Sequence, residues 1–158
     1  MIFHLDQQTF SYGKRSAHSA GPAALSDISL SIKAGEKVAL IGPSGAGKSS
    51  LLNLLYHNSP LQSAWCPQDG GLVDSLSVYN NIFSGGLERH STLYNLVNLL
   101  RPFAAPRKEI EVLARQLGLR DKLFTSVDQL SGGQRQRVAL GRALYRQQPV
   151  FLGDEPVA

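Results

Sequence analysis

The stretch that decides the fold is Gly42-Pro43-Ser44-Gly45-Ala46-Gly47-Lys48-Ser49. It fits the pattern G-x-x-x-x-G-K-[ST], in which glycines let backbone amides approach the oxygens of a phosphate group. The apolar run 37–41 before it predicts a buried strand, and the leucine-rich run 49–56 after it predicts a helix that ends at 58–60. A glycine-rich turn that precedes Lys48 and Ser49 by coincidence is the alternative, and the flanking strand and helix argue against it. The loop therefore predicts phosphate binding at a helix N-terminus.

Two side chains of this loop have separate expected roles. Lys48 supplies a mobile positive charge for the β- and γ-phosphates of a nucleotide. The Ser49 hydroxyl is a hard oxygen ligand, of the kind that Mg²⁺ prefers.

A second motif, Leu130-Ser131-Gly132-Gly133-Gln134, comes before a predicted helix at 134–147. Two adjacent glycines before a helix can form a second backbone site for an anion, and Ser131 can donate a hydroxyl hydrogen bond to a phosphate. A turn that only caps the helix, with Ser131 as the capping residue, explains the same residues. The motif by itself leaves both interpretations open.

A third motif is the apolar run 150–153 followed by Asp154 and Glu155. A strand that ends in two acids places carboxylates at the C-terminal edge of a sheet, where α/β folds bind ligands. We expect Asp154 to hold Mg²⁺ and Glu155 to polarise the attacking water as a general base. A solvated acid pair at a strand end is the alternative, and it is less favoured because the other two motifs occur in the same chain.

The rest of the chain alternates between strand and helix patterns. Residues 27–32 alternate apolar and polar side chains, which predicts a half-buried strand, and residues 16–22 predict a loop. The middle, 77–125, is richer in helical spacing, with Gly118 as a stop. In the helix at 134–147 we expect four side chains to face inward: Val138, Ala139, Leu144 and Tyr145. The order of elements predicts an α/β domain with a helical insertion.

The bulk composition is that of an ordinary globular domain. The chain has 158 residues, 42% hydrophobic and 18% charged, with a net charge of +4 that does not choose among phosphates, nucleic acid and anionic membranes. Cys66 is the single cysteine, so no internal disulfide can form. The N-terminus lacks the pattern of a secretory signal, and no apolar run is long enough for a membrane span. We expect a soluble, cytoplasmic-type protein that reaches a membrane only through a partner.

Together the three motifs resemble the ABC ATPase family, in which they are the Walker A loop, the signature motif and the Walker B strand with its catalytic glutamate. Gln68, after Pro67, resembles the family's Q-loop glutamine. Tyr12 resembles the aromatic residue that stacks on adenine, with Phe10 as the substitute candidate and ordinary packing as the alternative. The resemblance implies a P-loop NTPase fold with a mainly parallel sheet core and a helical insertion, cut off after the Walker B strand.

The resemblance also implies ATP and Mg²⁺ as cofactors and assigns the site residues. The catalytic residues are Glu155, Lys48 and Gln68, and the metal ligands are Ser49, Gln68 and Asp154. The ATP-binding residues are Tyr12, Gly42, Pro43, Ser44, Gly45, Ala46, Gly47, Lys48, Ser49 and Ser50. Residues 1–76 and 135–158 form the nucleotide-binding core of a single domain, and 77–134 form the helical signature subdomain.

The implied mechanism needs partners. Two such domains pair head to tail as a homodimer, so that the signature residues Leu130, Ser131, Gly132, Gly133 and Gln134 serve the ATP of the partner. Closure and reopening drive transmembrane permease subunits, which dock near the Q-loop and the helical region. The motor then lies on the inner face of the cell membrane. The segments 86–94 and 154–158 resemble the ATPases of phosphonate importers.

Two departures from the family pattern carry expectations. The sequence stops at Ala158, before the family's D-loop and switch histidine, so we expect this piece alone to be unstable and to hydrolyse ATP poorly. The span from Lys48 to Gln68 is short and lacks the antiparallel β-subdomain on the adenine side, which predicts weaker or less base-selective nucleotide binding.

Two other functions compete with a transporter motor. Soluble ABC ATPases of DNA repair or translation carry long coiled coils or paired cassettes, and this chain shows neither. No concentrated basic stripe is present either, so we expect no nucleic acid partner. A nucleotide-binding remnant without turnover is the third interpretation. Lys48, Asp154 and Glu155 argue against it, while the missing D-loop and switch histidine argue for it.

Overall fold

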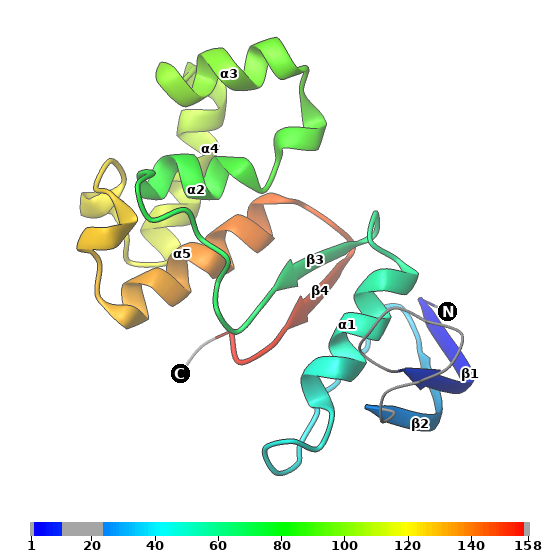
Figure 1. The fold of residues 1–158 in the computed structure, drawn as a ribbon. Coiled ribbons are helices and arrows are strands. Elements are labelled where there is room, and N and C mark those ends of the chain that lie inside the picture. Colours follow the sequence, from blue (N-terminus) through cyan, green and yellow to red (C-terminus); the bar gives the residue numbers. More distant parts are fainter. Residues whose placement is uncertain (1, 11–23, 157–158) are drawn as a thin grey trace, which may run out of the picture. The chain divides into compact units, whose positions relative to one another are not determined.

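The structure is a computed structural model that describes residues 2–10 and 24–156 (Figure 1). Its contacts divide the chain into two compact units, Met1–Pro60 and Leu61–Ala158. The first unit contains the glycine-rich loop, and the second contains the other two motifs. No helix in the described ranges is long and apolar enough to cross a membrane.

In its described residues, 2–10 and 24–60, the first unit consists of an antiparallel strand pair and one helix. β1 (Phe3–Phe10) pairs with β2 (Leu25–Ile32), and α1 (Lys48–Asn58) contacts β1. In β2, the side chains of Ile28, Leu30 and Ile32 are half-buried while the two serines between them are exposed. This alternation confirms the half-buried strand that the sequence predicts, because successive side chains of a strand point to opposite faces. The predicted loop at 16–22 lies outside the described residues.

The buried strand predicted at 37–41 is wrong. These residues have no regular structure, and Val38 and Ile41 are 53% and 95% exposed. A short apolar run becomes a strand only where a neighbouring strand offers partners for its backbone N–H and C=O groups. Neither β1 nor β2 pairs with 37–41, so the apolar pattern alone does not produce the strand.

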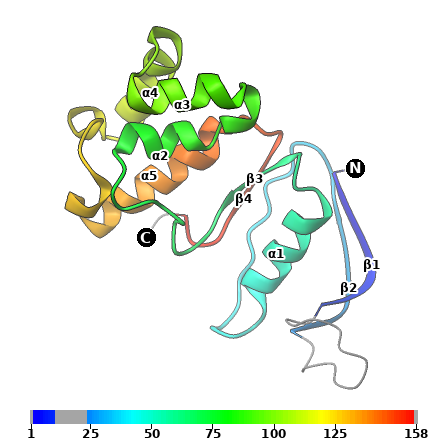
Figure 2. The same ribbon diagram turned by 45° about the horizontal axis from the view of Figure 1, so that its top comes forward.

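The second unit combines a parallel strand pair with a cluster of helices. β3 (Ser63–Cys66) pairs in parallel with β4 (Val150–Gly153), in the register Ser63↔Val150 to Cys66↔Gly153. The helices are α2 (Val78–Ser84), α3 (Thr92–Leu100), α4 (Ala104–Gln116) and α5 (Gly132–Tyr145). Short 3₁₀ turns follow at Leu87–Arg89, Arg120–Lys122 and Val127–Gln129. Figure 2 shows the four helices gathered beside the β3–β4 pair, as expected for a helical insertion between two strands of one sheet.

The core of this unit lies where α2 packs against α5 and α4. Val78, Tyr79, Ile82 and Phe83 of α2 are fully buried, and Val138 of α5 joins the same cluster. α4 ends at Gln116, and Gly118 follows in the left-handed region at φ 66°, which confirms Gly118 as the stop. These helices fix the position of the N-terminus of α5.

The inward-facing set predicted for α5 is right at three positions and wrong at one. Val138, Ala139 and Tyr145 are buried, but Leu144 is 43% exposed. Since an α-helix turns by about 100° per residue, Leu144 lies outside the arc that runs from Ala139 to Tyr145. The position of Leu144 on the helix, and not its apolar character, therefore decides its exposure.

α3 carries an exposed apolar stripe on one side. Leu93, Leu96 and Leu100 recur at helical spacing, and each is exposed, while Leu99 packs against the core. The spacing predicts the helix correctly. It does not tell which leucines face the interior.

Candidate nucleotide-binding site

The glycine-rich loop has the backbone geometry that its sequence requires. Gly45 and Gly47 lie in the left-handed region at φ 81° and 86°, where other residues are strained. Gly47 is the N-cap of α1, and no side chain caps this helix end. A Cβ at Gly47 would lie 2.9 Å from Leu25 Cδ2, so the loop also needs a glycine to approach β2. The N–H groups at the start of α1 therefore have no capping side chain, which is the arrangement of an anion site.

Lys48 bends back over the loop. Its Nζ donates hydrogen bonds to the carbonyl oxygens of Gly42, at 2.9 Å, and Pro43, at 3.0 Å. The ammonium group is thus held over the loop, where a phosphate could replace the carbonyls as its partner. Ser49 lies half-buried in the first turn of α1, and Ser50 beside it is buried.

In the second unit, the parallel register brings Gln68 and the two acids to one sheet edge. The Asp154 N–H donates to the Cys66 carbonyl at 2.9 Å, continuing the ladder by one residue beyond the strands. Just past this edge, the Gln68 Nε2 donates to the Glu155 Oε2 at 3.1 Å. The two side chains are 87 residues apart in sequence. Asp154 is buried and Glu155 is exposed.

Within the second unit, Gln68 and Asp154 offer oxygen atoms of the kind that fits a magnesium ion. Gln68 uses its amide N–H toward Glu155, which leaves its amide oxygen for a cation, and Asp154 offers a carboxylate. The Ser49 hydroxyl is the third predicted ligand, and it belongs to the first unit. Hydroxyl, amide and carboxylate oxygens are hard ligands, as Mg²⁺ prefers. Among the described residues no group of three or more His, Cys, Asp or Glu side chains could hold a metal ion.

The signature motif forms the N-terminus of α5 with a complete capping box. The Ser131 Oγ accepts from the Gln134 N–H at 3.4 Å, and the Gln134 side chain accepts from the Ser131 N–H at 3.0 Å. The capping interpretation is therefore correct for Ser131 and Gln134. Capping does not account for the glycines between them, because a Cβ at Gly132 or Gly133 would meet no atom within 4 Å.

A cavity of about 540 Å³ connects this turn with the residues around Gln68. Its lining comprises Gln68, Asp69, Gly70, Leu72, Gly132, Gly133, Arg135 and Gln136. Leu130, the first residue of the motif, is buried in the helical core instead. Of the residues predicted for the second unit, Gln68, Gly132 and Gly133 thus line one opening.

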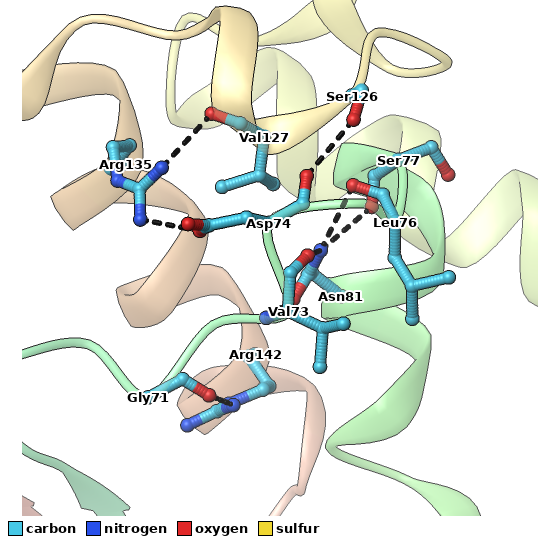
Figure 3. A network of polar contacts seen from close by, with 10 residues as sticks. All are labelled: Gly71, Val73, Asp74, Leu76, Ser77, Asn81, Ser126, Val127, Arg135 and Arg142. Atoms are coloured by element: carbon cyan, nitrogen blue, oxygen red, sulfur yellow. Dashed lines mark hydrogen bonds and ion pairs between the residues drawn. The ribbon is translucent and has the colours of Figure 1, made fainter.

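The sequence does not predict the arginines that hold the chain after Gln68. Arg142 on α5 donates to the Gly71 carbonyl (Figure 3). It also donates to the Gly70 carbonyl at 2.9 Å. Burial lowers the pKa of the Arg142 guanidinium, and burial raises the pKa of the nearby Cys66 thiol. The two adjacent glycines, Gly70 and Gly71, are the sequence signal for this contact, because glycine allows the positive φ values that both residues adopt. Backbone bent in this way at two consecutive residues exposes its carbonyls to a donor.

Two aromatic candidates for adenine stacking remain. Tyr12 lies outside the described residues. Phe10 ends β1, where its carbonyl accepts from the Ala24 N–H at 2.8 Å. The choice between them stays a prediction.

Curated relatives of this chain are import ATPases. The phosphonates import ATP-binding protein PhnC of Pseudomonas fluorescens (strain Pf0-1) is 39% identical over 166 residues, covering 89% of this chain and 62% of that protein. PhnC of Pseudomonas entomophila (strain L48) is 42% identical over 161 residues, covering 85% and 60%. The thiamine import ATP-binding protein ThiQ of Escherichia coli O6:K15:H31 (strain 536 / UPEC) is 39% identical over 144 residues, covering 82% and 60%. The chain spans about three fifths of the length of these relatives.

Solved structures and a family model agree with these relatives. The dimeric structure of MJ0796, a bacterial ABC transporter cassette, superposes with a TM-score of 0.76 at 24% identity, covering 97% of this chain and 73% of that one. The post-hydrolysis state of the same ATP-binding cassette, bound to ADP and Pi, gives a TM-score of 0.72 at 25% identity, with the same coverage. The family model described as ABC transporter matches residues 25–158. This chain therefore belongs to the ABC transporter family and has the P-loop NTPase fold of its ATP-binding domains.

Proposed function

We propose that this chain binds Mg-ATP and hydrolyses it as the motor subunit of an ABC importer. The observation that carries the proposal is the hydrogen bond between Gln68 and Glu155 at the carboxyl edge of the parallel strands. The bond holds an exposed carboxylate at the edge of the sheet where α/β folds bind their ligands. This is what a general base for an attacking water needs.

Each residue of the proposed site has one task. Glu155 accepts a proton from the water, and Gln68 orients the Glu155 carboxylate. Asp154, Gln68 and Ser49 supply oxygen ligands for Mg²⁺, which neutralises charge on the phosphates when it is bound. Lys48 exchanges its two loop carbonyls for β- and γ-phosphate oxygens. The backbone N–H groups of Ser44 to Ser50 hold the phosphates at the start of α1.

The signature turn is proposed to serve the nucleotide of a second copy. Gly132 and Gly133 are required neither by space within this chain nor by a positive φ. A glycine in such a place fits a ligand that approaches the backbone from outside. The dimeric MJ0796 cassette supports a pair of this kind, and the proposed assembly is a head-to-tail homodimer.

The transport role rests on the relatives and on one surface. PhnC proteins are named for phosphonate import, so we propose a phosphonate-like solute and permease partners at the inner face of the cell membrane. The exposed leucines of α3, namely Leu93, Leu96 and Leu100, give the second unit an apolar stripe. Exposed apolar patches of this kind mark sites of contact with another protein.

Hydrolysis of Mg-ATP by the complete protein tests the proposal. We expect turnover in the wild type and a loss of about a hundredfold or more in Glu155→Gln, because a general base contributes that much. Glu111→Gln is the matched control, since Glu111 is a partly exposed acid in an ion pair on α4. If the wild type binds ATP and does not turn it over, the protein is a nucleotide-binding remnant.

The solute is tested separately. With its permease in proteoliposomes, the ATPase should be stimulated by a phosphonate and its binding protein. Thiamine, the solute named for the ThiQ relative, serves as the comparison. Stimulation by thiamine alone would contradict the phosphonate assignment and leave the motor role intact.

A further inference from the structure

The guanidinium group of Arg135 bonds both to the chain after Gln68 and to the chain just before the signature motif. The Nη2 of Arg135 lies 2.5 Å from the Asp74 carboxylate, and its Nη1 donates to the Val127 carbonyl at 3.3 Å (Figure 3). Arg135 follows the signature motif directly. Asp74 lies six residues after Gln68, and Val127 lies four residues before Ser131. Arg135 therefore connects both segments at once.

The backbone around Asp74 strengthens the same connection. The Asp74 carbonyl accepts from the Ser126 Oγ at 2.9 Å and from the Asp128 N–H at 3.1 Å. The Val127 N–H donates to the Leu76 carbonyl at 3.0 Å. Residues 74–76 are thus bonded to residues 126–128 through three hydrogen bonds besides the ion pair.

Asn81 on α2 fixes the shape of this segment. Its Oδ1 accepts from the Val73 N–H at 2.9 Å, and its Nδ2 lies within hydrogen-bond distance of the carbonyls of Val73, Leu76 and Ser77. The side chain is buried, so these contacts are shielded from water. The backbone on both sides of Asp74 is therefore held by Asn81 through bonds that do not involve Arg135.

Electrostatics explains why a carboxylate is placed here. Arg135 stands in the first turns of α5, where the helix dipole disfavours a cation, and no acidic residue lies in the first turn of that helix. Asp74 supplies the missing negative charge from 61 residues away. Because the two side chains are 36% and 61% exposed, the pair contributes little to the stability of the fold. Its effect is on the position of the guanidinium group.

Arg142 holds the same chain nearer to Gln68. It lies seven residues after Arg135, two turns further along α5, and it binds the Gly70 and Gly71 carbonyls. Two arginines of α5 therefore bond to the segment 70–74, Arg142 at the Gly70 and Gly71 carbonyls and Arg135 at the Asp74 carboxylate. Through these contacts the chain that follows Gln68 is bonded to the helix that begins with Gly132.

We propose that Asp74 and Arg135 are positioning residues that couple the turn at Gln68 to the signature turn. The proposal rests on the proposed function, in which Gln68 faces the nucleotide of its own copy and Gly132 and Gly133 face that of the partner. The ion pair keeps the signature turn in register with Gln68. Neither residue touches the reacting atoms.

The test compares Asp74→Asn with Glu111→Gln in the complete protein. Both changes remove a charge from an exposed Arg–carboxylate pair, and Glu111 lies on α4 outside the network. For Asp74→Asn we expect the kcat for Mg-ATP to fall about fivefold or more, because couplings between sites are of that size. ATP binding to the monomer, measured with Glu155→Gln in the background, should stay unchanged, and so should the melting temperature. Glu111→Gln should change none of the three.

A charge swap distinguishes a positioning role of the ion pair from a role in stability alone. Asp74→Arg combined with Arg135→Asp should recover more of the kcat than either single change retains. A wild-type kcat in Asp74→Asn would overturn the proposal while the proposed function stood. The proposal would also be overturned if Asp74→Asn lowered the kcat and the melting temperature together and the double swap did not recover the kcat. An inactive wild type would refute the proposed function itself, and the coupling with it.

Discussion

At the scale of single residues, the glycines of the phosphate loop and those of the signature turn are subject to different structural constraints. Gly47 needs its left-handed torsion and its close approach to Leu25. Gly132 needs neither, because its φ is not positive and an added Cβ would meet open space. The folded chain thus explains the first glycine completely. The folded chain leaves the second unexplained, and the proposed function assigns it to a ligand that approaches from outside the chain.

Replacing Gly132 with alanine separates folding from function. Alanine favours helix over glycine by up to about 1 kcal/mol, so Gly132→Ala should melt at the wild-type temperature or slightly above it. We expect its ATP turnover to fall about tenfold or more, because the methyl group occupies the approach to the backbone amides. Steady-state kinetics and calorimetry measure the two effects. Full turnover in Gly132→Ala would remove the signature turn from the site.

The thiol of Cys66 reports on the second unit. Its side chain is buried at the end of β3, and burial raises its pKa. Because the pKa of the thiol is higher in the folded than in the unfolded chain, the folded state favours the neutral thiol. The resulting contribution of Cys66 to stability is fully present below the pKa of the unfolded thiol. It declines as the pH rises above that value, where the unfolded chain ionises.

Alkylation of Cys66 by iodoacetamide at pH 8 measures this protection. The reaction should be slower in the native protein than in the urea-unfolded chain by about two orders of magnitude or more, because the thiolate is the reactive form. Equal rates in the two states would show that the end of β3 opens freely.

At the scale of elements, the close approach of α2 to α5 depends on small residues. Gly85 caps α2 at φ −64°, a torsion that any residue adopts. A Cβ at Gly85 would lie 2.0 Å from the Arg142 carbonyl oxygen. The backbone of α5 leaves no room there, so the two helices can pack only if this position lacks a side chain.

Gly85→Ala should therefore destabilise the second unit. We expect a loss of about 2–3 kcal/mol in the free energy of unfolding, since the clash is with backbone and cannot be relieved by a rotamer change. Denaturation in urea, followed by the fluorescence of the single tryptophan, Trp65 on β3, measures the loss. Gly132→Ala is the matched control, because its added methyl meets no atom within 4 Å. Equal midpoints for the two variants would contradict this packing.

At the scale of the whole molecule, the proposed function needs two copies. The proposed site combines the glycine-rich loop of one copy with the signature turn of the other. The chain itself places Gln68, Glu155 and the signature turn in one unit and Lys48 in the other. A homodimer built head to tail then contains two equal sites.

Mixing two inactive variants tests this arrangement. Lys48→Ala disables the loop and Gly132→Asp disables the signature turn, so each homodimer should be inactive. In an equal mixture about half of the pairs are mixed, and each of these holds one intact site and one doubly damaged site. We expect turnover of about a quarter of the wild-type value. No recovery on mixing would mean that each copy uses its own signature turn.

Base selectivity is a second property at this scale. α1 ends at Asn58 and β3 begins at Ser63, so the described chain has no further strand between the helix and the sheet. With so little protein beyond α1 to contact a base, ATP and GTP should bind with similar affinity. Competition between the two nucleotides measures this, and strong preference for ATP would contradict it.

The sequence by itself determined the features that depend on neighbours along the chain. The torsions of Gly45 and Gly47, the capping box of Ser131 and Gln134, the alternation in β2 and the stop at Gly118 all follow from short-range geometry. Capping bonds reach three residues and strand alternation has a period of two, so the local sequence contains all the information needed.

Only the tertiary structure decided the features that join distant residues. It placed Gln68 against Glu155 and Asp74 against Arg135, left 37–41 without a strand, and turned Leu144 to the surface. Each of these depends on which partner the fold brings near a residue. Periodicity and composition describe a residue's own preferences, whereas a hydrogen bond or a strand needs a second chain segment whose position is set by the packing of the whole unit.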